Sequence, residues 1–197
     1  MSKFVILGTA HGSNVAGKRS PDGRLREYAY SREICRRVKA ELDKRGVDCT
    51  IDIPTDYEAG LGTRCRLVNK IVAEHGGAKN CIYVSIHNNA AGNGGWKSAR
   101  GFCVYAYTGA STASKSLASI FARRAVAMQL KGNRAYPATQ YYTASFAVLR
   151  DTTCPAVLTE NLFQDNINDV EFLLSDRGKQ TITQLHVDSI LEYLGKA

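Results

Sequence analysis

Four ionisable side chains stand where buried elements are expected to end or to begin. His87 and Glu160 each directly follow a short apolar run rich in β-branched residues, and His11 comes four residues after another such run. Glu27 lies in the first turn of an expected helix. Ligands of open α/β sheets bind just beyond the carboxyl ends of the strands. We therefore expect the side chains that follow the three strands to converge in one cleft.

Two histidines and one carboxylate suit a catalytic zinc site, in which three protein ligands leave one position open. A separate carboxylate beside the site would complete a metallohydrolase. The sequence has no compact motif such as His-Glu-x-x-His. The residues alone therefore leave open that His11 and His87 are loop residues bonded to local backbone. They also leave open that Glu27 is a solvated carboxylate favoured by the helix dipole.

The elements that would position these side chains alternate between strands and helices. The expected strands span 4–8, 49–53, 82–86, 101–107 and 154–161, with a short strand or extended run at 146–149. The expected helices span about 25–45, 61–74, 111–130, 166–174 and 179–194, the third capped by Ser111 or Ser114. This pattern predicts a single α/β domain: a mostly parallel or mixed twisted sheet of about six strands, flanked by helices on both faces.

The remaining histidines and the cysteines fit structural roles better than ligand roles. His75 precedes Gly76 at an expected helix end, where it would bond the last carbonyls. His186 lies at the edge of an apolar helical stripe, so we expect it to be packed or on the surface. The six cysteines form no Cys-x-x-Cys pair and are expected to be free buried thiols. The polar and aromatic segment 131–145 is a plausible rim for the cleft, and a Gly-rich loop holds Trp96.

Composition limits the kinds of partner. The net charge of +8 favours an anionic polymer, but the basic residues are scattered through helices and no nucleic-acid-binding signature is present. No apolar run approaches the roughly 20 residues that a membrane helix needs. No charged-then-apolar leader follows the first residue. We therefore expect no nucleic-acid partner, no membrane insertion, and synthesis in the cytoplasm without an export signal of its own.

Four motifs surround the candidate residues, in order along the chain. They are Thr9-Ala10-His11-Gly12-Ser13, then Gly23-Arg24-Leu25-Arg26-Glu27, then Ser85-Ile86-His87-Asn88-Asn89-Ala90, and finally Val148-Leu149-Arg150 with Pro155-Ala156-Val157-Leu158-Thr159-Glu160, Phe163 and Asn166. Together they resemble the zinc-dependent N-acetylmuramoyl-L-alanine amidases of the amidase 3 type, over nearly the whole chain. The sequence departs from the family pattern at Ser13, where a second Gly is usual, and at Tyr28, where a Lys is usual.

The resemblance implies His11, Glu27 and His87 as ligands of one zinc ion and Glu160 as the catalytic carboxylate. It implies hydrolysis of the amide bond between N-acetylmuramoyl groups and the L-alanine of the stem peptide in bacterial peptidoglycan. Asn89 is a candidate substrate-binding residue. Arg150 is a second candidate: it either binds a substrate carboxylate or pairs with Asp151.

The resemblance also suggests how the protein works as a whole. We expect residues 1–197 to form one amidase catalytic domain without a separate cell-wall-binding domain, and to be monomeric. Such a protein would be a phage endolysin made in the host cytoplasm, or a bacterial autolysin, reaching the wall after release. The alternatives are a zinc carboxypeptidase-like peptide hydrolase, whose usual His-x-x-Glu pair is missing here, and a non-catalytic wall-binding protein of the same fold.

Overall fold

A six-stranded mixed sheet forms the centre of the computed structural model, which describes residues 3–92 and 94–196. The strands are β1 (Phe4–Thr9), β2 (Cys49–Ile51), β3 (Cys81–Asn89), β4 (Cys103–Tyr107), β5 (Tyr142–Ala144) and β6 (Ala156–Phe163). Their order across the sheet is β2-β1-β3-β6-β4-β5. Strands β2, β1, β3 and β6 run parallel to one another. Strand β4 pairs antiparallel with β6 and parallel with β5. The predicted fold class is confirmed.

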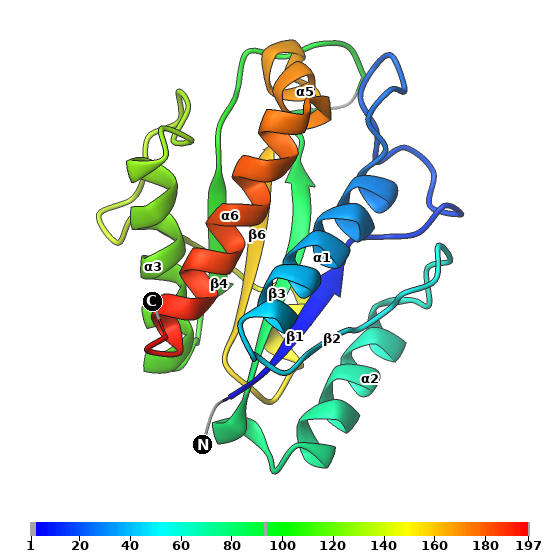
Figure 1. Cartoon of the computed structure of the whole chain (residues 1–197). Helices are drawn as coiled ribbons and strands as arrows, with labels where there is room; N and C mark the ends of the chain where they lie inside the picture. The colour runs from blue at the N-terminus through cyan, green and yellow to red at the C-terminus, as the bar shows by residue number, and fades with distance from the viewer. Residues whose placement is uncertain (1–2, 93, 197) are drawn as a thin grey trace.

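Helices cover both faces of this sheet (Figure 1). They are α1 (Glu27–Lys44), α2 (Leu61–Glu74), α3 (Thr112–Ala127), α4 (Ala147–Arg150), α5 (Ile167–Leu174) and α6 (Asp176–Tyr193), with a short 3₁₀ turn at Ala78–Asn80. Ser111 caps the N-terminus of α3, where its side chain accepts from the Ser114 amide, and Asn166 caps α5 by accepting from two backbone amides. The helix boundaries lie within a few residues of the predicted ones, and those of α2 coincide with them.

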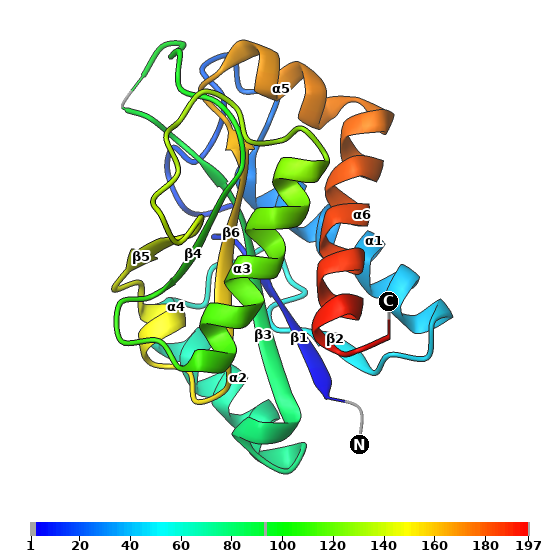
Figure 2. The same cartoon turned by 90° about the vertical axis from the view of Figure 1, so that its left-hand side faces the viewer.

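Side-chain alternation along the strands divides the core into two layers. Val5 and Leu7 of β1 pack in one cluster with buried residues of α1, α3, α5 and α6, while Ile6 between them packs in a second cluster with α2 and α4. Helices α1, α6 and α3 lie side by side over the first face (Figures 1 and 2). The candidate histidine of β3 belongs to the second face, because residues 81 and 83, in step with His87, pack there.

One element differs from its prediction. The run Phe146–Leu149 was predicted to be a short strand or extended segment, but residues 147–150 form the single helical turn α4. The sixth strand of the sheet is instead β5, which lies inside the predicted rim segment 131–145. A four-residue apolar run carries no periodicity that separates strand from helix. The turn packs between α2 and β6, and this tertiary contact selects the helical form.

The smaller predictions of core structure are confirmed. All six cysteines are free and buried. The His75 ring lies 2.9 Å from the Ile71 carbonyl oxygen at the end of α2, and His186 is fully buried in α6.

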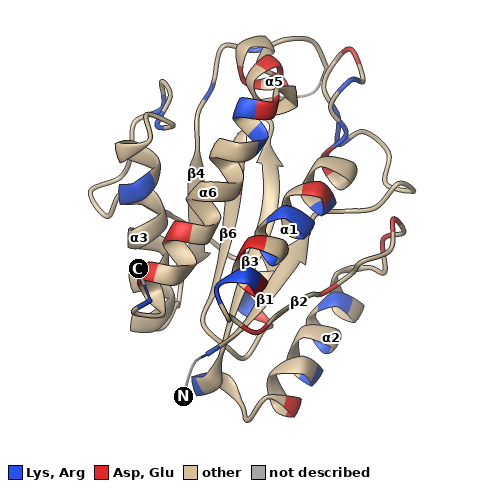
Figure 3. Cartoon of the chain, viewed as in Figure 1, with Lys and Arg blue, Asp and Glu red and all other residues tan. Residues whose placement is uncertain are grey.

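Among the described helices, none combines the length and apolar character needed to cross a membrane. Lys and Arg are distributed over helices and loops and do not form a tail (Figure 3). Part of the Gly-rich loop before Trp96, at Asn93, lies outside the described residues.

Candidate active site

The three strands β1, β3 and β6 are adjacent and parallel, so their carboxyl ends meet at one edge of the sheet. His87 of β3 and Glu160 of β6 are register partners, which puts their side chains next to each other on the same face. His11 follows the end of β1 by two residues, and Glu27 is the first residue of α1. The structure therefore brings all four predicted residues to the same end of the sheet.

His11, Glu27 and His87 form a compact group that could hold a metal ion. One ligand atom from each lies within 4.8 Å of the others. The Glu27 carboxylate bridges the two rings: its Oε1 lies 3.2 Å from His87 Nδ1, and its Oε2 lies 3.5 Å from His11 Nε2. The two imidazole rings meet edge to face with centroids 5.4 Å apart. Two imidazole nitrogens and one carboxylate oxygen thus point at a common centre.

The electrostatics of this group favour ligation. Burial opposes ionisation of Glu27, but hydrogen bonds with His11 and His87 outweigh burial and lower the pKa of Glu27 to about 2. Burial also lowers the pKa of His87, and the neighbouring Glu27 charge only partly offsets this. At neutral pH the pair is therefore a carboxylate beside a neutral imidazole. These are the protonation states in which both side chains bind a metal.

His87 is held in place by its own strand and the next one. Ser85 Oγ, two residues earlier on the same face of β3, lies 3.0 Å from His87 Nε2. A ring nitrogen held in this way fixes the orientation of the other nitrogen, here Nδ1 beside Glu27. Asn161 of β6 donates its side-chain amide to the His87 carbonyl oxygen at 2.9 Å. Both the ring and the backbone of His87 are thus fixed before any ligand binds.

His11 is positioned by α1, the helix that carries Glu27. The His11 backbone has a positive φ of 43°, which is unusual for a residue with a side chain. Arg32, almost completely buried, donates to the carbonyl oxygens of His11 at 2.8 Å and Ala10 at 2.9 Å. The Ser31 hydroxyl accepts from the Ala10 amide at 2.8 Å and donates to the Ile86 carbonyl at 2.6 Å. One turn of α1 therefore fixes the strand ends that carry both histidines.

Glu160 faces a pocket of about 240 Å³ that it shares with both histidines. Burial and the nearby Glu27 charge raise the pKa of Glu160 well above its ordinary value, and Lys18 opposes this. Its Oε2 atom is buried and has no hydrogen-bond partner among the described residues. An unpartnered carboxylate oxygen in a pocket is available to a reacting molecule. This is the property expected of a general base.

The pocket wall comes from the α2 and α4 face of the sheet. Its other residues are Lys18, Glu58, Leu61, Arg64, Phe146, Ala147, Val148 and Leu158. Arg64 is fixed beneath the pocket, since its guanidinium pairs with Asp52 at 2.8 Å and with Glu58 at 3.2 Å. Tyr83 donates to the same Asp52 carboxylate at 2.9 Å. The floor of the site is therefore a rigid charged network with its charges paired.

The two candidate substrate-binding residues do not line this pocket. Arg150 forms a two-pronged ion pair with Asp151, both N–O distances being 2.7 Å, which is the second of its predicted alternatives. It lines a different pocket, beside Leu149 and Pro155. Asn89 accepts from the Ala90 amide, and its side-chain nitrogen is buried without a partner in the described chain. Contact of either residue with substrate stays a prediction.

Sequence reasoning missed the residues that support the site. Ser85 had a usable signal, because residues two apart on a strand share a face, and it precedes His87 by two. Ser31 and Arg32 follow Glu27 by four and five residues, so they lie one turn along the same helix. Lys18 and Glu58 reach the pocket from loops, and no periodicity in the sequence indicates their position.

The sequence of this chain matches a known protein family. Residues 5–192 match the family described as N-acetylmuramoyl-L-alanine amidase (Amidase_3). The endolysin of Bacillus phage SPP1 is 32% identical over 205 residues, covering 98% of this chain and 67% of the endolysin. The amidase CwlM of Bacillus licheniformis is 25% identical and is matched over 66% of its length. The chain thus spans about two thirds of these relatives.

Solved structures show the same fold. The crystal structure of an N-acetylmuramoyl-L-alanine amidase from Clostridium difficile 630 superposes with a TM-score of 0.84 at 22% identity, covering 98% of this chain and 97% of that one. The catalytic domain of CwlV from Bacillus (Paenibacillus) polymyxa var. colistinus gives a TM-score of 0.80 at 23% identity, covering 99% of both. Nearly every residue of the chain therefore has a counterpart in these folds.

Proposed function

The chain belongs to the N-acetylmuramoyl-L-alanine amidase family, whose members cleave peptidoglycan, and we propose that it is a zinc-dependent hydrolase of this kind. Its substrate would be the amide bond between the lactyl group of N-acetylmuramic acid and the L-alanine of the stem peptide. One observation carries the proposal. His11, Glu27 and His87 offer three ligand atoms within 4.8 Å of one another, directly beside the unpartnered carboxylate of Glu160.

The donor set fits zinc. Imidazole and carboxylate are ordinary zinc ligands, and three protein ligands leave one position for a reacting molecule, as in catalytic zinc sites. The hydroxyl of Ser85 holds the far nitrogen of His87, which is the second layer of contacts that such ligands require. In this proposal His11, Glu27 and His87 hold one ion, which when bound supplies Lewis-acid polarisation of an amide carbonyl and of a water molecule.

Glu160 would move the proton. Its Oε2 has no hydrogen-bond partner among the described residues, so this oxygen would be free to take a proton from the attacking water and pass it to the leaving amide nitrogen. The neighbouring register position of His87 keeps this carboxylate at a fixed place relative to the ligand group. Apolar side chains of Leu61, Phe146 and Leu158 line the same pocket and limit the water around the reacting bond.

A single-domain organisation, and release to the wall after synthesis, stay predictions.

Zymography on purified peptidoglycan, with and without a chelator, tests the proposal. We expect clearing that the chelator abolishes and added zinc restores, with free stem peptides and intact glycan among the products by mass spectrometry. Stem peptides still joined to sugar would contradict the assigned bond while keeping the metal. Zinc binding without clearing would contradict catalysis and favour a wall-binding protein. Cleavage of free peptides alone would favour the carboxypeptidase-like alternative.

A further inference from the structure

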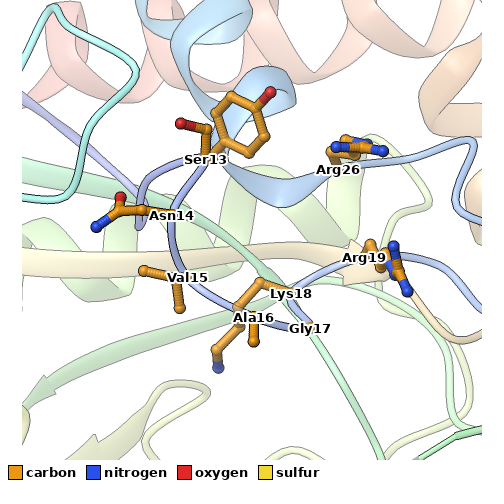
Figure 4. Close-up of a pocket in the computed structure, with 9 residues that line it drawn as sticks. Ser13, Asn14, Val15, Ala16, Gly17, Lys18, Arg19 and Arg26 are labelled. Atoms are coloured by element: carbon orange, nitrogen blue, oxygen red, sulfur yellow. The ribbon is translucent and has the colours of Figure 1, made fainter.

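A second pocket, of about 320 Å³, lies in the loop that joins β1 to α1 (Figure 4). Its lining is Ser13, Asn14, Val15, Ala16, Gly17, Lys18, Arg19, Arg26 and Tyr28. Three of these nine residues are basic, and none is acidic. Eight of these nine residues lie between His11 and Glu27 along the chain, and the ninth, Tyr28, directly follows Glu27.

Backbone hydrogen bonds hold the loop in a defined shape. The Lys18 carbonyl accepts from the Glu27 amide at 2.9 Å, and the Ser20 amide donates to the Leu25 carbonyl at 2.9 Å. Between these two bonds, Arg19 and Arg26 pair as an antiparallel bridge. The two arginine side chains therefore start from directly opposed positions, and Figure 4 shows them one above the other at the same end of the pocket.

Arg19 and Arg26 form no ion pair with a carboxylate in the described part of the chain. Like charges at opposed positions of an antiparallel pair repel each other. In the part of the chain that the structure describes, no carboxylate oxygen lies within ion-pair distance of the Lys18, Arg19 or Arg26 side chains. The acids nearby in the loop region are engaged elsewhere, since Asp22 and Glu171 both pair with Arg24. Both arginine side chains are exposed, so their guanidinium groups are accessible to an anionic ligand.

Lys18 connects this pocket to the active site. It lines both pockets, here beside Arg19 and there beside His11 and Glu160. Its backbone carbonyl holds the amide of Glu27, so the loop cannot shift without moving the first turn of α1. A substrate with its scissile amide at Glu160 can therefore extend past Lys18 toward the two arginines.

We propose that Arg19 and Arg26 bind a carboxylate of the stem peptide and so determine which peptidoglycan fragments are cleaved. This inference rests on the proposed function. On the sugar side of the scissile bond the lactyl carboxyl is consumed in the amide and the N-acetyl groups are neutral. The free carboxylates of such a substrate belong to the stem peptide, and a planar guanidinium group recognises a carboxylate through two parallel hydrogen bonds.

Turnover of matched substrates tests the assignment. The variants are Arg19→Gln, Arg26→Gln and the double variant, with Arg36→Gln as control, an exposed position on α1 about 15 Å along the helix from Arg26. The substrates are muramoyl peptides whose stem carboxylates are either free or amidated. We expect the double variant to lower kcat/KM on the free-carboxylate substrate roughly 10- to 100-fold, mainly through KM. The amidated substrate and the control variant should show little change.

A binding measurement separates failure of this inference from failure of the proposed function. Calorimetry of zinc-loaded protein with isolated stem peptides, free and amidated, needs no turnover. Tighter binding of the free form that disappears in the double variant supports the site even if another bond is cleaved. Equal binding of both peptides, or an equal loss on both substrates with zinc content unchanged, overturns it. Lys18 is left unchanged because it also lines the active-site pocket.

Discussion

At the scale of single residues, the site depends on the pairing of His87 with Glu160. Neighbouring strands lie about 4.8 Å apart, and the hydrogen-bond ladder between β3 and β6 keeps these two side chains on one face at fixed relative positions. If His87 binds the metal and Glu160 transfers the proton, as proposed, the two side chains need no loop movement to meet. The chemical roles of the two residues can therefore be separated by substitution.

Replacing Glu160 with Gln removes the proton acceptor while keeping the shape of the side chain. We expect kcat to fall by about 10²- to 10⁴-fold, the usual contribution of a general acid–base group. Zinc content should stay at the wild-type level, because Glu160 is not one of the three grouped ligand atoms. Rates on peptidoglycan fragments and metal analysis of the same preparation check both parts. Wild-type turnover in this variant would remove Glu160 from the mechanism.

Replacing His87 with Ala should lower the zinc content as well as the activity, in contrast to Glu160→Gln, which should keep its zinc. The variant keeps Glu27 and His11, but two ligands hold zinc far less tightly than three. Zinc content after dialysis against a weak chelator measures the effect, with His75→Ala, at the surface end of α2, as the matched control. A zinc content equal to wild type would contradict the ligand role of His87.

The strand pattern of the sequence was enough to place the candidate residues at one end of the sheet, but it did not identify the residues that support them. His11, His87 and Glu160 each follow an apolar run, so strand ends locate them. Arg150 shows the limit, because the sequence left open whether its guanidinium binds a substrate carboxylate or pairs with Asp151, and the folded chain forms the pair with Asp151. Lys18 reaches the pocket because the loop folds back on Glu27, a tertiary contact without a sequence period.

At the scale of elements, α1 is the part of the structure that assembles the site. Its first residue is the bridging carboxylate Glu27, and its next turn supplies Ser31 and Arg32, which hold the backbone of Ala10, His11 and Ile86. The guanidinium of Arg32 also donates to the Thr55 carbonyl at 2.7 Å. One rigid helix therefore sets the relative positions of the ends of β1 and β3.

Replacing Arg32 with Lys tests this role. A lysine ammonium keeps the charge but cannot span the carbonyls of Ala10, His11 and Thr55 in one plane. We expect zinc affinity to fall by about 10- to 100-fold, as when contacts behind metal ligands are lost. Competition with a fluorescent zinc chelator measures it, and Arg36→Lys on the exposed side of α1 is the control. Unchanged affinity in Arg32→Lys would show that α1 positions the site without this side chain.

The elements predicted best were those with a strong period or a clear boundary. Helix α2 shows apolar residues at steps of three and four and ends before two glycines, so both of its boundaries were predicted. The segment from β5 to α4 has three extended and four helical residues, each too short to show a period. Packing of α4 against α2 and β6 decides its form, and only the folded chain contains that contact.

At the scale of the whole molecule, one buried histidine links the sheet to the helical layer. His186 of α6 is completely buried, and its Nε2 lies 2.9 Å from the Thr159 hydroxyl on β6. Its Nδ1 lies 2.8 Å from the Ile182 carbonyl, and the ring meets Phe121 of α3 edge to face. Thr159 directly precedes Glu160, so this contact lies immediately behind the active site and couples its strand to the opposite face.

Burial lowers the pKa of His186 from 6.5 to about 4. Between these values the unfolded chain binds a proton that the folded chain does not, so the folded state loses stability as the pH falls. The contribution is complete above pH 6.5 and decreases by about 1.4 kcal/mol per unit below it, reaching a loss of roughly 3 kcal/mol near pH 4. Urea unfolding of the metal-free protein at pH 7.5 and 5.0 measures this dependence without interference from zinc release.

His186→Gln should flatten that dependence. The variant loses the titrating ring and is less stable at pH 7.5, because part of a buried hydrogen-bond network is lost. Its free energy of unfolding should then fall by about 2 kcal/mol less than that of the wild type between pH 7.5 and 5.0. His75→Gln, at the exposed end of α2, is the matched control for replacing a histidine outside the core. Equal slopes in wild type and His186→Gln would mean that the buried histidine accepts its proton inside the fold, with Thr159 and Phe121 moving to accommodate it.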